Sequence, residues 1–223
     1  ISGRLGPSAL IGIQAVLLGL AVGLILGILA AWKHNSGIDY FTMILAVLGV
    51  SVPNFVAAAL LQYFIGLKWG ILPVGFWTNW DCSVLPSIAL SFSATAMVAR
   101  FMRTEMLDVL DQDYIVTARA KGISQMKVLM RHAVRNSVLP VVTILGPVVV
   151  NLMTGSLAVE NIFSIPGIGS LFVDCIKAND YPVIMGITIF YAAFYMLVVL
   201  LIDLVYSVID PRIRLAKGKE DES

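Results

Sequence analysis

The sequence predicts an all-α protein that crosses a membrane several times, and three observations support this fold class. The 223-residue chain is 59% hydrophobic and only 13% charged, with a mean hydropathy of +0.90, whereas a soluble domain has about 25% charged residues. The hydrophobic residues are gathered in long blocks separated by short polar connections. The basic residues are distributed unevenly among these connections. Together these observations exclude a soluble globular domain.

The hydrophobic blocks have the length of membrane-crossing helices. A helix rises about 1.5 Å per residue, so about 20 residues cross a hydrocarbon core that is ~30 Å thick. In a soluble core, a helix with more than about 14 consecutive apolar residues is rare. We therefore treat residues 1–223 as a single transmembrane domain. Its five predicted spans are residues 9–32, 40–66, 86–107, 138–159 and 183–206.

The connections on one side of the membrane carry most of the positive charge. Twelve of the 15 Lys and Arg residues lie in the turn at 33–39, in the segment 100–137 or after residue 206. The other side carries only Arg4, Lys68 and Lys177. Because positively charged connections tend to remain in the cytoplasm, we predict that the first group is cytoplasmic.

The first predicted span carries a stripe of small residues. In a bilayer, small side chains allow two helix backbones to approach closely, and such contacts are a main source of helix association. We therefore predict that this stripe is a packing seam. Its members recur at every fourth position and so share one helical face: Ala15, Gly19, Gly23, Gly27 and Ala31.

Polar and helix-breaking residues inside two spans form a candidate translocation path. Pro53 lacks a backbone donor and is expected to bend or break the second span. Asn54 and Gln62 follow in the same segment, and Asn151 lies in the fourth span. A polar route through the bundle and a simple irregularity of helix packing explain these residues equally well, so both interpretations stay open here.

The sequence does not indicate any chemistry of its own. No ionisable residue lies in the middle of a predicted span, which argues against a self-contained ion-coupled carrier. GxxxxGK[ST] and HExxH motifs are absent, GxSxG does not occur in a suitable context, and His34 and His132 are too far apart for a metal cluster. We therefore predict no catalytic, cofactor or metal site, and driven transport would need another subunit. Cys82 and Cys175 lie near the outer face, where a disulfide is one option.

The basic cytoplasmic segment has the pattern of two short helices. Acidic residues precede Tyr114–Lys121 and Gly122 follows it, which is the order expected around one helix. Asp111 or Asp113 is expected to cap this helix. A second helix is expected to begin after Ser124 as its N-cap.

Two roles fit the resulting loop, residues 108–137. Its positive charge suits an anchor on anionic lipid. Its order of acid, helix, glycine and helix favours docking to a protein, because isolated helices shorter than about 12–15 residues are marginal in water. Ala118, Ala120 and Gly122 are small enough for the first helix to sit deeply in a groove.

The stretch "DYIVTARAKGISQMKVLMRHAVRNSVLP", residues 113–140, resembles the cytoplasmic EAA loop of ABC-importer permeases of the peptide and nickel branch. Other stretches that fit this branch follow in order: "GRLGPS", "SVPNF", "ENIFSIPGIGSLF", "DYP" and "DPRIR". The set is most similar to the B-type subunits of oligopeptide and dipeptide importers. In that family the loop forms a coupling helix that docks on the ATPase subunit. The resemblance therefore implies that ATPase coupling involves Asp113, Tyr114, Thr117, Ala118, Arg119, Ala120, Lys121 and Gly122.

The resemblance also implies an architecture. The type I ABC-importer permease fold of this branch has six helices, so one N-terminal helix and an outer segment are expected in addition to the five spans. Pro166, Gly167 and Gly169 would belong to a re-entrant element that faces the substrate-binding protein. A Gly/Pro turn without a partner is the alternative for these three residues.

The implied function is that of a permease subunit of an ATP-driven importer for oligopeptides or dipeptides, in a bacterial or archaeal cytoplasmic membrane. The expected partners are a homologous second permease, two ATP-binding subunits, an extracytoplasmic substrate-binding protein and the lipid bilayer, but no nucleic acid. ATP and Mg²⁺ would bind to the ATPase subunits, and no cofactor is expected in this chain. Nickel and glutathione are alternative substrates. A self-contained secondary transporter or channel, or an intramembrane enzyme, would be a different class of protein.

Overall fold

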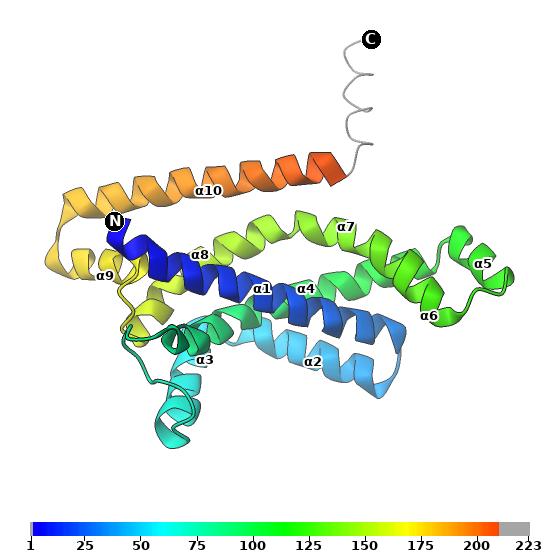
Figure 1. Ribbon diagram of the computed structural model, residues 1–223, viewed down its shortest axis with the longest axis horizontal. Helices are drawn as coiled ribbons and strands as arrows, with labels where there is room; N and C mark the ends of the chain where they lie inside the picture. Colours follow the sequence, from blue (N-terminus) through cyan, green and yellow to red (C-terminus); the bar gives the residue numbers. More distant parts are fainter. Residues whose placement is uncertain (1, 210–223) are drawn as a thin grey trace, which may run out of the picture.

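The computed structural model describes residues 2–209, apart from several side chains inside α8 and near the end of α10. Most helices run along one long axis (Figure 1), and the all-α prediction is confirmed. In chain order the helices are α1 Ser2–Trp32, α2 Gly37–Ser51, α3 Asn54–Leu61, α4 Val84–Leu110, α5 Asp113–Ala120, α6 Gln125–Val128, α7 Arg135–Thr143, α8 Leu145–Ile162, α9 Ile168–Ala178 and α10 Tyr181–Ile209. The π-helical segments Gln62–Lys68 and Leu129–Val134 extend α3 and α6, and the 3₁₀ turn Trp80–Ser83 precedes α4.

α1 and α4 form the central pair of the bundle, and the small-residue stripe of α1 lies between them. A Cβ atom on Gly19 would lie 2.6 Å from the Cβ atom of Ala94, and one on Gly27 would lie 2.6 Å from the carbonyl oxygen of Ala99. Both separations are far below van der Waals contact, so the two backbones approach as closely as glycine permits. All five residues of the stripe are buried. The predicted packing seam is confirmed.

The second predicted span, residues 40–66, is not one straight helix. α2 and the helix formed by α3 with its π-helical extension meet at 101°. Pro53 has no N–H to donate, and Val52 adopts an extended conformation (φ −84°, ψ 117°) that suits the residue before a proline. The expectation that Pro53 breaks this span is confirmed, and two helices replace the single span.

Within the described residues, three helices are long and apolar enough to cross a membrane: Ser2–Trp32, Trp80–Leu110 and Tyr181–Ile202. The bent α2–α3 pair provides a fourth if it counts as one span. The predicted span 138–159 falls on α7 and α8, which are separated at Ile144. The protein is therefore a multi-pass membrane protein, and the number of five spans stays a prediction.

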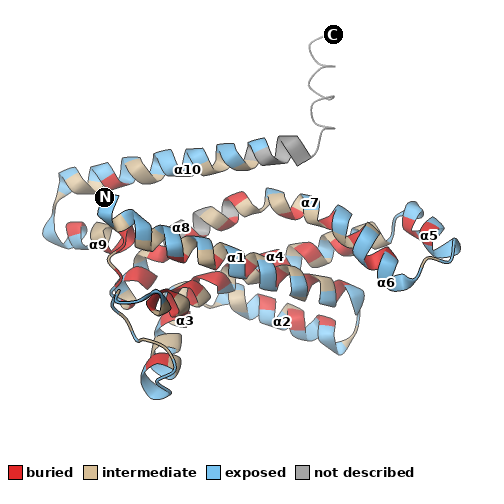
Figure 2. Cartoon of the chain, in the orientation of Figure 1, coloured by how far each residue is buried: buried red, intermediate tan, exposed pale blue. Residues whose placement is uncertain are grey.

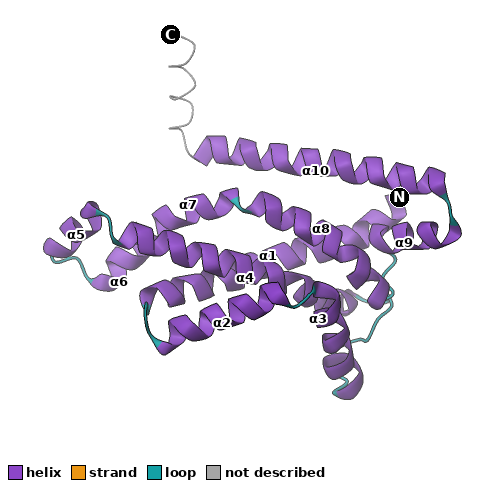
Figure 3. Ribbon diagram, turned by 180° about the vertical axis from the view of Figure 1, so that it is seen from behind, coloured by secondary structure: helices purple, strands orange, loops and turns teal. Residues whose placement is uncertain are grey.

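Apolar packing is divided between the two ends of the bundle. At the end that holds α9, buried residues of α1, α4 and α8 surround the fully buried Phe163. At the opposite end, Met102 and Met106 of α4 pack with Ala31 and Leu129. α10 lies along one side of the bundle (Figures 1 and 3). Its apolar surface is largely exposed (Figure 2), as expected for a helix that faces lipid.

Candidate functional site

The candidate site is the hairpin of α5 and α6 at the end of the bundle opposite α9 (Figure 1). Gln112 is the N-cap of α5 and has an extended backbone (φ −75°, ψ 146°). The expectation that Asp111 or Asp113 caps this helix is therefore wrong. Asp111 still has a helical backbone at the end of α4, and Asp113 already lies in the first turn of α5. There its negative charge is favourable next to the helix N-terminus.

The hairpin turn forms as the sequence predicts. Gly122 has φ of +75°, a left-handed conformation that L side chains rarely adopt. Its N–H donates a hydrogen bond to the carbonyl oxygen of Arg119 at 3.0 Å, which closes α5. α6 then begins after Ser124 as its N-cap.

α5 is held against its own chain by a small apolar cluster. Ile115 and Ala118 of α5 and Val128 of α6 are only 0%, 8% and 1% exposed. Val109 and Leu110, at the end of α4, pack against them. Ala118, expected to help seat the helix in a partner's groove, therefore contacts its own chain instead. This cluster joins α5 to the end of α4.

The outward face of α5 is accessible. Val116 is 57% exposed and Tyr114 is 44% exposed. The Tyr114 hydroxyl accepts a hydrogen bond from Nδ2 of Asn136 at 2.9 Å, which restrains the ring. Ala118 is the one buried residue among those predicted for coupling. The remaining six are exposed like Tyr114: Asp113, Thr117, Arg119, Ala120, Lys121 and Gly122.

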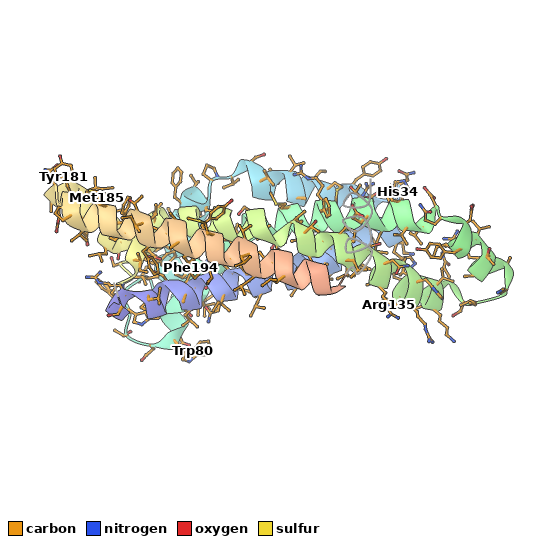
Figure 4. The ribbon with its side chains drawn as sticks, turned by 90° about the horizontal axis from the view of Figure 1, so that it is seen from above. His34, Trp80, Arg135, Tyr181, Met185 and Phe194 are labelled. Atoms are coloured by element: carbon orange, nitrogen blue, oxygen red, sulfur yellow. The ribbon has the colours of Figure 1, made fainter. Side chains whose placement is uncertain are left out.

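The second half of the predicted loop is a helix that continues into the bundle. α6, its π-helical extension and α7 follow one another without a break, so the helix passes through residue 137, where the loop was expected to end. Leu129 and Ala133 are buried in the same part of the core as Met102 and Met106. Arg131 and Arg135 are exposed, and Arg135 lies on the outside of the bundle in Figure 4. The hairpin is thus joined to the bundle by two helices, α4 and α6–α7.

Gln62, a candidate for the translocation path, makes structural hydrogen bonds. Its Nε2 donates to the carbonyl oxygens of Val74 and Ile162, at 2.6 and 2.9 Å. These contacts tie the extension of α3 to the outer loop and to the end of α8. They account for the glutamine without any contact to a transported solute.

The other three path candidates lie in two separate places. Pro53 is exposed at the bend, and Asn54 is half-buried as the first residue of α3. Asn151 lies in α8, but its side chain falls outside the described residues. A role of these residues in translocation stays a prediction.

A buried carboxylate organises the connection between α8 and α9. Glu160 is 0% exposed. Its Oε1 accepts a hydrogen bond from the Ser8 hydroxyl of α1 at 2.8 Å, and its Oε2 accepts one from the Ser170 N–H of α9 at 3.1 Å. The Ser8 hydroxyl in turn accepts a hydrogen bond from the N–H of Ile168 at 2.8 Å. The carboxylate therefore joins three helices, and it lies where the N-terminus of α9 favours a negative charge.

Gly167 and Gly169 leave space for this carboxylate. A Cβ atom on Gly167 would overlap Oε2 of Glu160, and one on Gly169 would lie 2.8 Å from the same oxygen. Both glycines are buried, whereas Pro166 is half-buried. The two glycines, expected to face a binding protein, are thus required by the internal site around Glu160.

Neither the cysteines nor a metal cluster adds a further site. Cys82 and Cys175 are both buried free thiols. Across residues 2–209, no group of three or more His, Cys, Asp and Glu side chains is arranged to hold a metal ion.

Sequence reasoning missed an ion pair near the end of the bundle that carries the α5–α6 hairpin. Asp39 of α2 is 2% exposed, and Arg103 of α4 donates to both of its oxygens, from Nε to Oδ1 at 2.6 Å and from Nη2 to Oδ2 at 2.7 Å. The N–H of Asn35 donates to Oδ2 of Asp39 at 3.0 Å. Nδ1 of His34, which is labelled in Figure 4, lies 3.2 Å from the same oxygen. The pair is 64 residues apart in the chain. The sequence signal was weak, because Arg103 is one of three charged residues, with Arg100 and Glu105, at the end of the predicted span 86–107.

Comparison with known proteins identifies one matching family and two kinds of peptide permease as relatives of this chain. The family described as "Binding-protein-dependent transport system inner membrane component" matches residues 23–215. The dipeptide transport system permease protein DppB of Bacillus subtilis is 46% identical over 209 residues, which cover 93% of this chain and 67% of the relative. The oligopeptide transport system permease protein OppB of Salmonella typhimurium is 40% identical over 211 residues, covering 93% of this chain and 68% of the relative.

Two solved structures share the fold. A chain of the MetNI methionine ABC transporter in an inward-facing conformation has a TM-score of 0.71 at 15% identity, over 94% of both chains. A chain of an amino acid ABC transporter solved with histidines has a TM-score of 0.67 at 18% identity, over 94% of this chain and 92% of the other. Identities this low support the shared fold alone.

Proposed function

This chain belongs to the family of binding-protein-dependent transport system inner membrane components, and from this premise we propose that it is the permease subunit of an ATP-driven importer of dipeptides or oligopeptides. The peptide class is supported by the names of relatives that are 46% and 40% identical to the chain. The type I ABC-importer permease fold of the chain agrees with this function. The proposed location is the cytoplasmic membrane of a bacterium or archaeon.

In the proposed assembly the chain pairs with a homologous second permease. Two ATP-binding subunits bind on the cytoplasmic side, and an extracytoplasmic binding protein delivers the peptide. ATP and Mg²⁺ bind to the ATP-binding subunits, and this chain performs no covalent chemistry. The lack of a nucleotide-phosphate motif in the sequence supports this division of labour.

The observation that carries the proposal is the exposed outward face of α5, on a helix packed against the ends of α4 and α6. In the proposed mechanism, closure of the ATP-binding subunits displaces α5. Because α4 and α6–α7 are joined to this hairpin, they move with it and alternate the bundle between inward-open and outward-open states. ATPase coupling then uses the exposed residues around Val116. Ala118, on the buried face of α5, holds the helix against α4 and α6.

A charge on the outward face of α5 tests this function. In proteoliposomes that contain the full complex, the binding protein and ATP, we expect Val116→Asp to lower peptide uptake at least about tenfold, because burying an unpaired charge in an apolar contact costs more than the ~1.4 kcal/mol that corresponds to tenfold. Lys33→Ala, a change in the exposed α1–α2 turn, is expected to leave uptake nearly unchanged. Equal uptake by the Val116→Asp and wild-type complexes would refute docking through α5.

Two further measurements separate the alternatives. Mass spectrometry of the ligand that co-purifies with the binding protein distinguishes peptides from nickel and from glutathione. Ion-driven flux through the purified chain alone in liposomes would identify a secondary transporter or channel and exclude the proposed function.

A further inference from the structure

We infer that the ion pair between Asp39 and Arg103 is the link that makes α2 follow α4 when α5 is displaced. Asp39 and Arg103 are then positioning residues for transport, since they act through the helices that they join. The inference rests on the proposed function, because α5 must be driven by a partner.

Apart from this pair, α2 packs on α4 through small residues, and a Cβ atom on Gly49 would lie 3.0 Å from the Cβ atom of Ala96. The only residues of α2 buried in the structure are Asp39, Thr42 and Ala46, and large side chains such as Phe41 and Ile44 are 63% and 58% exposed. A groove of about 560 Å³ borders α2, α3 and α4. Because small residues bury little apolar area, each of these contacts between α2 and α4 contributes less than a contact between large side chains.

The ion pair provides a directional contact that the apolar surface lacks. Two nitrogens of the Arg103 guanidinium donate to the two oxygens of Asp39, at 2.6 and 2.7 Å. This two-pronged geometry fixes both distance and orientation. Asp39 also accepts a hydrogen bond from the N–H of Asn35, whose φ is +58°. The carboxylate therefore holds the α1–α2 turn as well as the start of α2.

Arg103 is also well placed to receive movement from α5. It lies about two turns before Leu110 on the same helix, and Leu110 packs against the apolar cluster that holds α5. A pocket of about 220 Å³ between the α1–α2 turn and the hairpin is lined by His34, Asp111 and Arg119, among others. The turn that presents Asp39 is therefore adjacent to the coupling hairpin.

The other end of α2 leads to the outer side of the bundle. Beyond the bend at Pro53, Gln62 ties the extension of α3 to the carbonyl oxygens of Val74 and Ile162. If α2 no longer follows α4, movement of the hairpin stops being passed on to this outer contact. The expected defect is ATP hydrolysis without transport.

The test compares peptide taken up per ATP hydrolysed by the full complex in proteoliposomes. Asp39→Asn removes the ion pair at nearly constant size, and we expect the ratio to fall about tenfold while ATP hydrolysis stays within about twofold of wild type. Arg103→Lys keeps the charge without the two-pronged contact and should give an intermediate ratio. Arg100→Ala removes an exposed arginine one turn earlier on the same helix and should leave the ratio unchanged.

A distance measurement tests the geometry independently of transport. Spin labels on the exposed residues Val47 of α2 and Met97 of α4, in a background with Cys82→Ser and Cys175→Ser, report the separation of the two helices. In the ATP-bound complex we expect the wild-type distance to stay as in the apo complex, and the distance in Arg103→Lys and Asp39→Asn to shift or broaden.

The outcomes separate the two hypotheses. A wild-type complex without ATP-driven peptide uptake counts against the proposed function. If the wild type transports and Asp39→Asn keeps the wild-type ratio, the positioning role is refuted. It is also refuted if uptake, hydrolysis and assembly decline together while the distance between α2 and α4 stays as in the wild type, because the pair would then be merely structural.

Discussion

The two ends of the molecule each bury a carboxylate, but they hold it in different ways. Near the end with the α5–α6 hairpin, Asp39 is bound by the guanidinium of Arg103. At the end that holds α9, Glu160 is bound by the Ser8 hydroxyl and by a backbone N–H of α9, and no ion pair to Glu160 is formed among the residues that the structure describes. Asp39 joins α2 and α4 through its pair with Arg103. Glu160 instead occupies a space left by Gly167 and Gly169.

This difference indicates that the two ends differ in mobility. Glu160 cannot leave its site without exposing the N-terminal N–H groups of α9 and the Ser8 hydroxyl, all of which need acceptors. Arg103 is 22% exposed, so it can regain polar contacts if it separates from Asp39. We therefore interpret the connection around Glu160 as a rigid corner. The Asp39–Arg103 end is adjustable in the sense that the pair holds α2 to α4 while it is intact but can be broken and re-formed at lower cost.

The largest expected effect comes from filling the space beside Glu160. Gly167 has an extended backbone (φ −95°, ψ −179°) that any residue adopts, so Gly167→Ala is opposed by overlap with the Glu160 carboxylate and with the Ser8 hydroxyl, and not by the backbone. Displacing this buried carboxyl group leaves several hydrogen-bonding groups without partners, and each such group costs about 1–3 kcal/mol. We expect a corresponding loss in the free energy of unfolding, measured by denaturation of the purified permease in detergent.

Gly12→Ala is the matched control, because a Cβ atom at Gly12 meets no heavy atom within 4 Å. This change is expected to leave stability nearly unaltered. If Gly167→Ala is as stable as Gly12→Ala, the outer corner is not rigid and the comparison between the two ends fails.

The next effect compares the two carboxylates directly. Glu160→Gln turns an amide NH₂ toward buried donors, and an unsatisfied buried group costs about 1–3 kcal/mol. Asp39→Asn should cost less, about 1 kcal/mol, because Arg103 is partly exposed and solvent reduces the loss. Parallel unfolding measurements give the order. A larger loss for Asp39→Asn than for Glu160→Gln would reverse the assignment of rigid and adjustable ends.

An effect between those at Glu160 and Asp39 is expected at Ser8, which both donates to Glu160 and accepts from the N–H of Ile168. Ser8→Ala removes both hydrogen bonds and should lower the free energy of unfolding by about 1–2 kcal/mol. Ser51→Ala is the control, because that exposed hydroxyl bonds only to the Val47 carbonyl within its own helix. Equal stability of the two variants would show that α1 is not anchored through Ser8.

Much of the architecture follows from local patterns in the sequence. Long apolar blocks predict the membrane helices, because their length matches the bilayer. The spacing of Gly19, Gly23 and Gly27 predicts the seam between α1 and its neighbour, because residues four apart share one helical face. Pro53 predicts the break between α2 and α3, and Gly122 predicts the turn of the hairpin, since each acts on its own backbone.

The tertiary structure alone decided which side chains meet. Asp39 and Arg103 are 64 residues apart, and Glu160 and Ser8 are 152 residues apart, so no periodicity in the chain connects them. The same holds for Ala118, which turned out to face its own chain, and for Gln62, whose partners lie in the outer loop and at the end of α8. Helix formation depends on neighbouring residues, whereas ion pairs, glycine-lined spaces and buried faces depend on how the helices pack against one another.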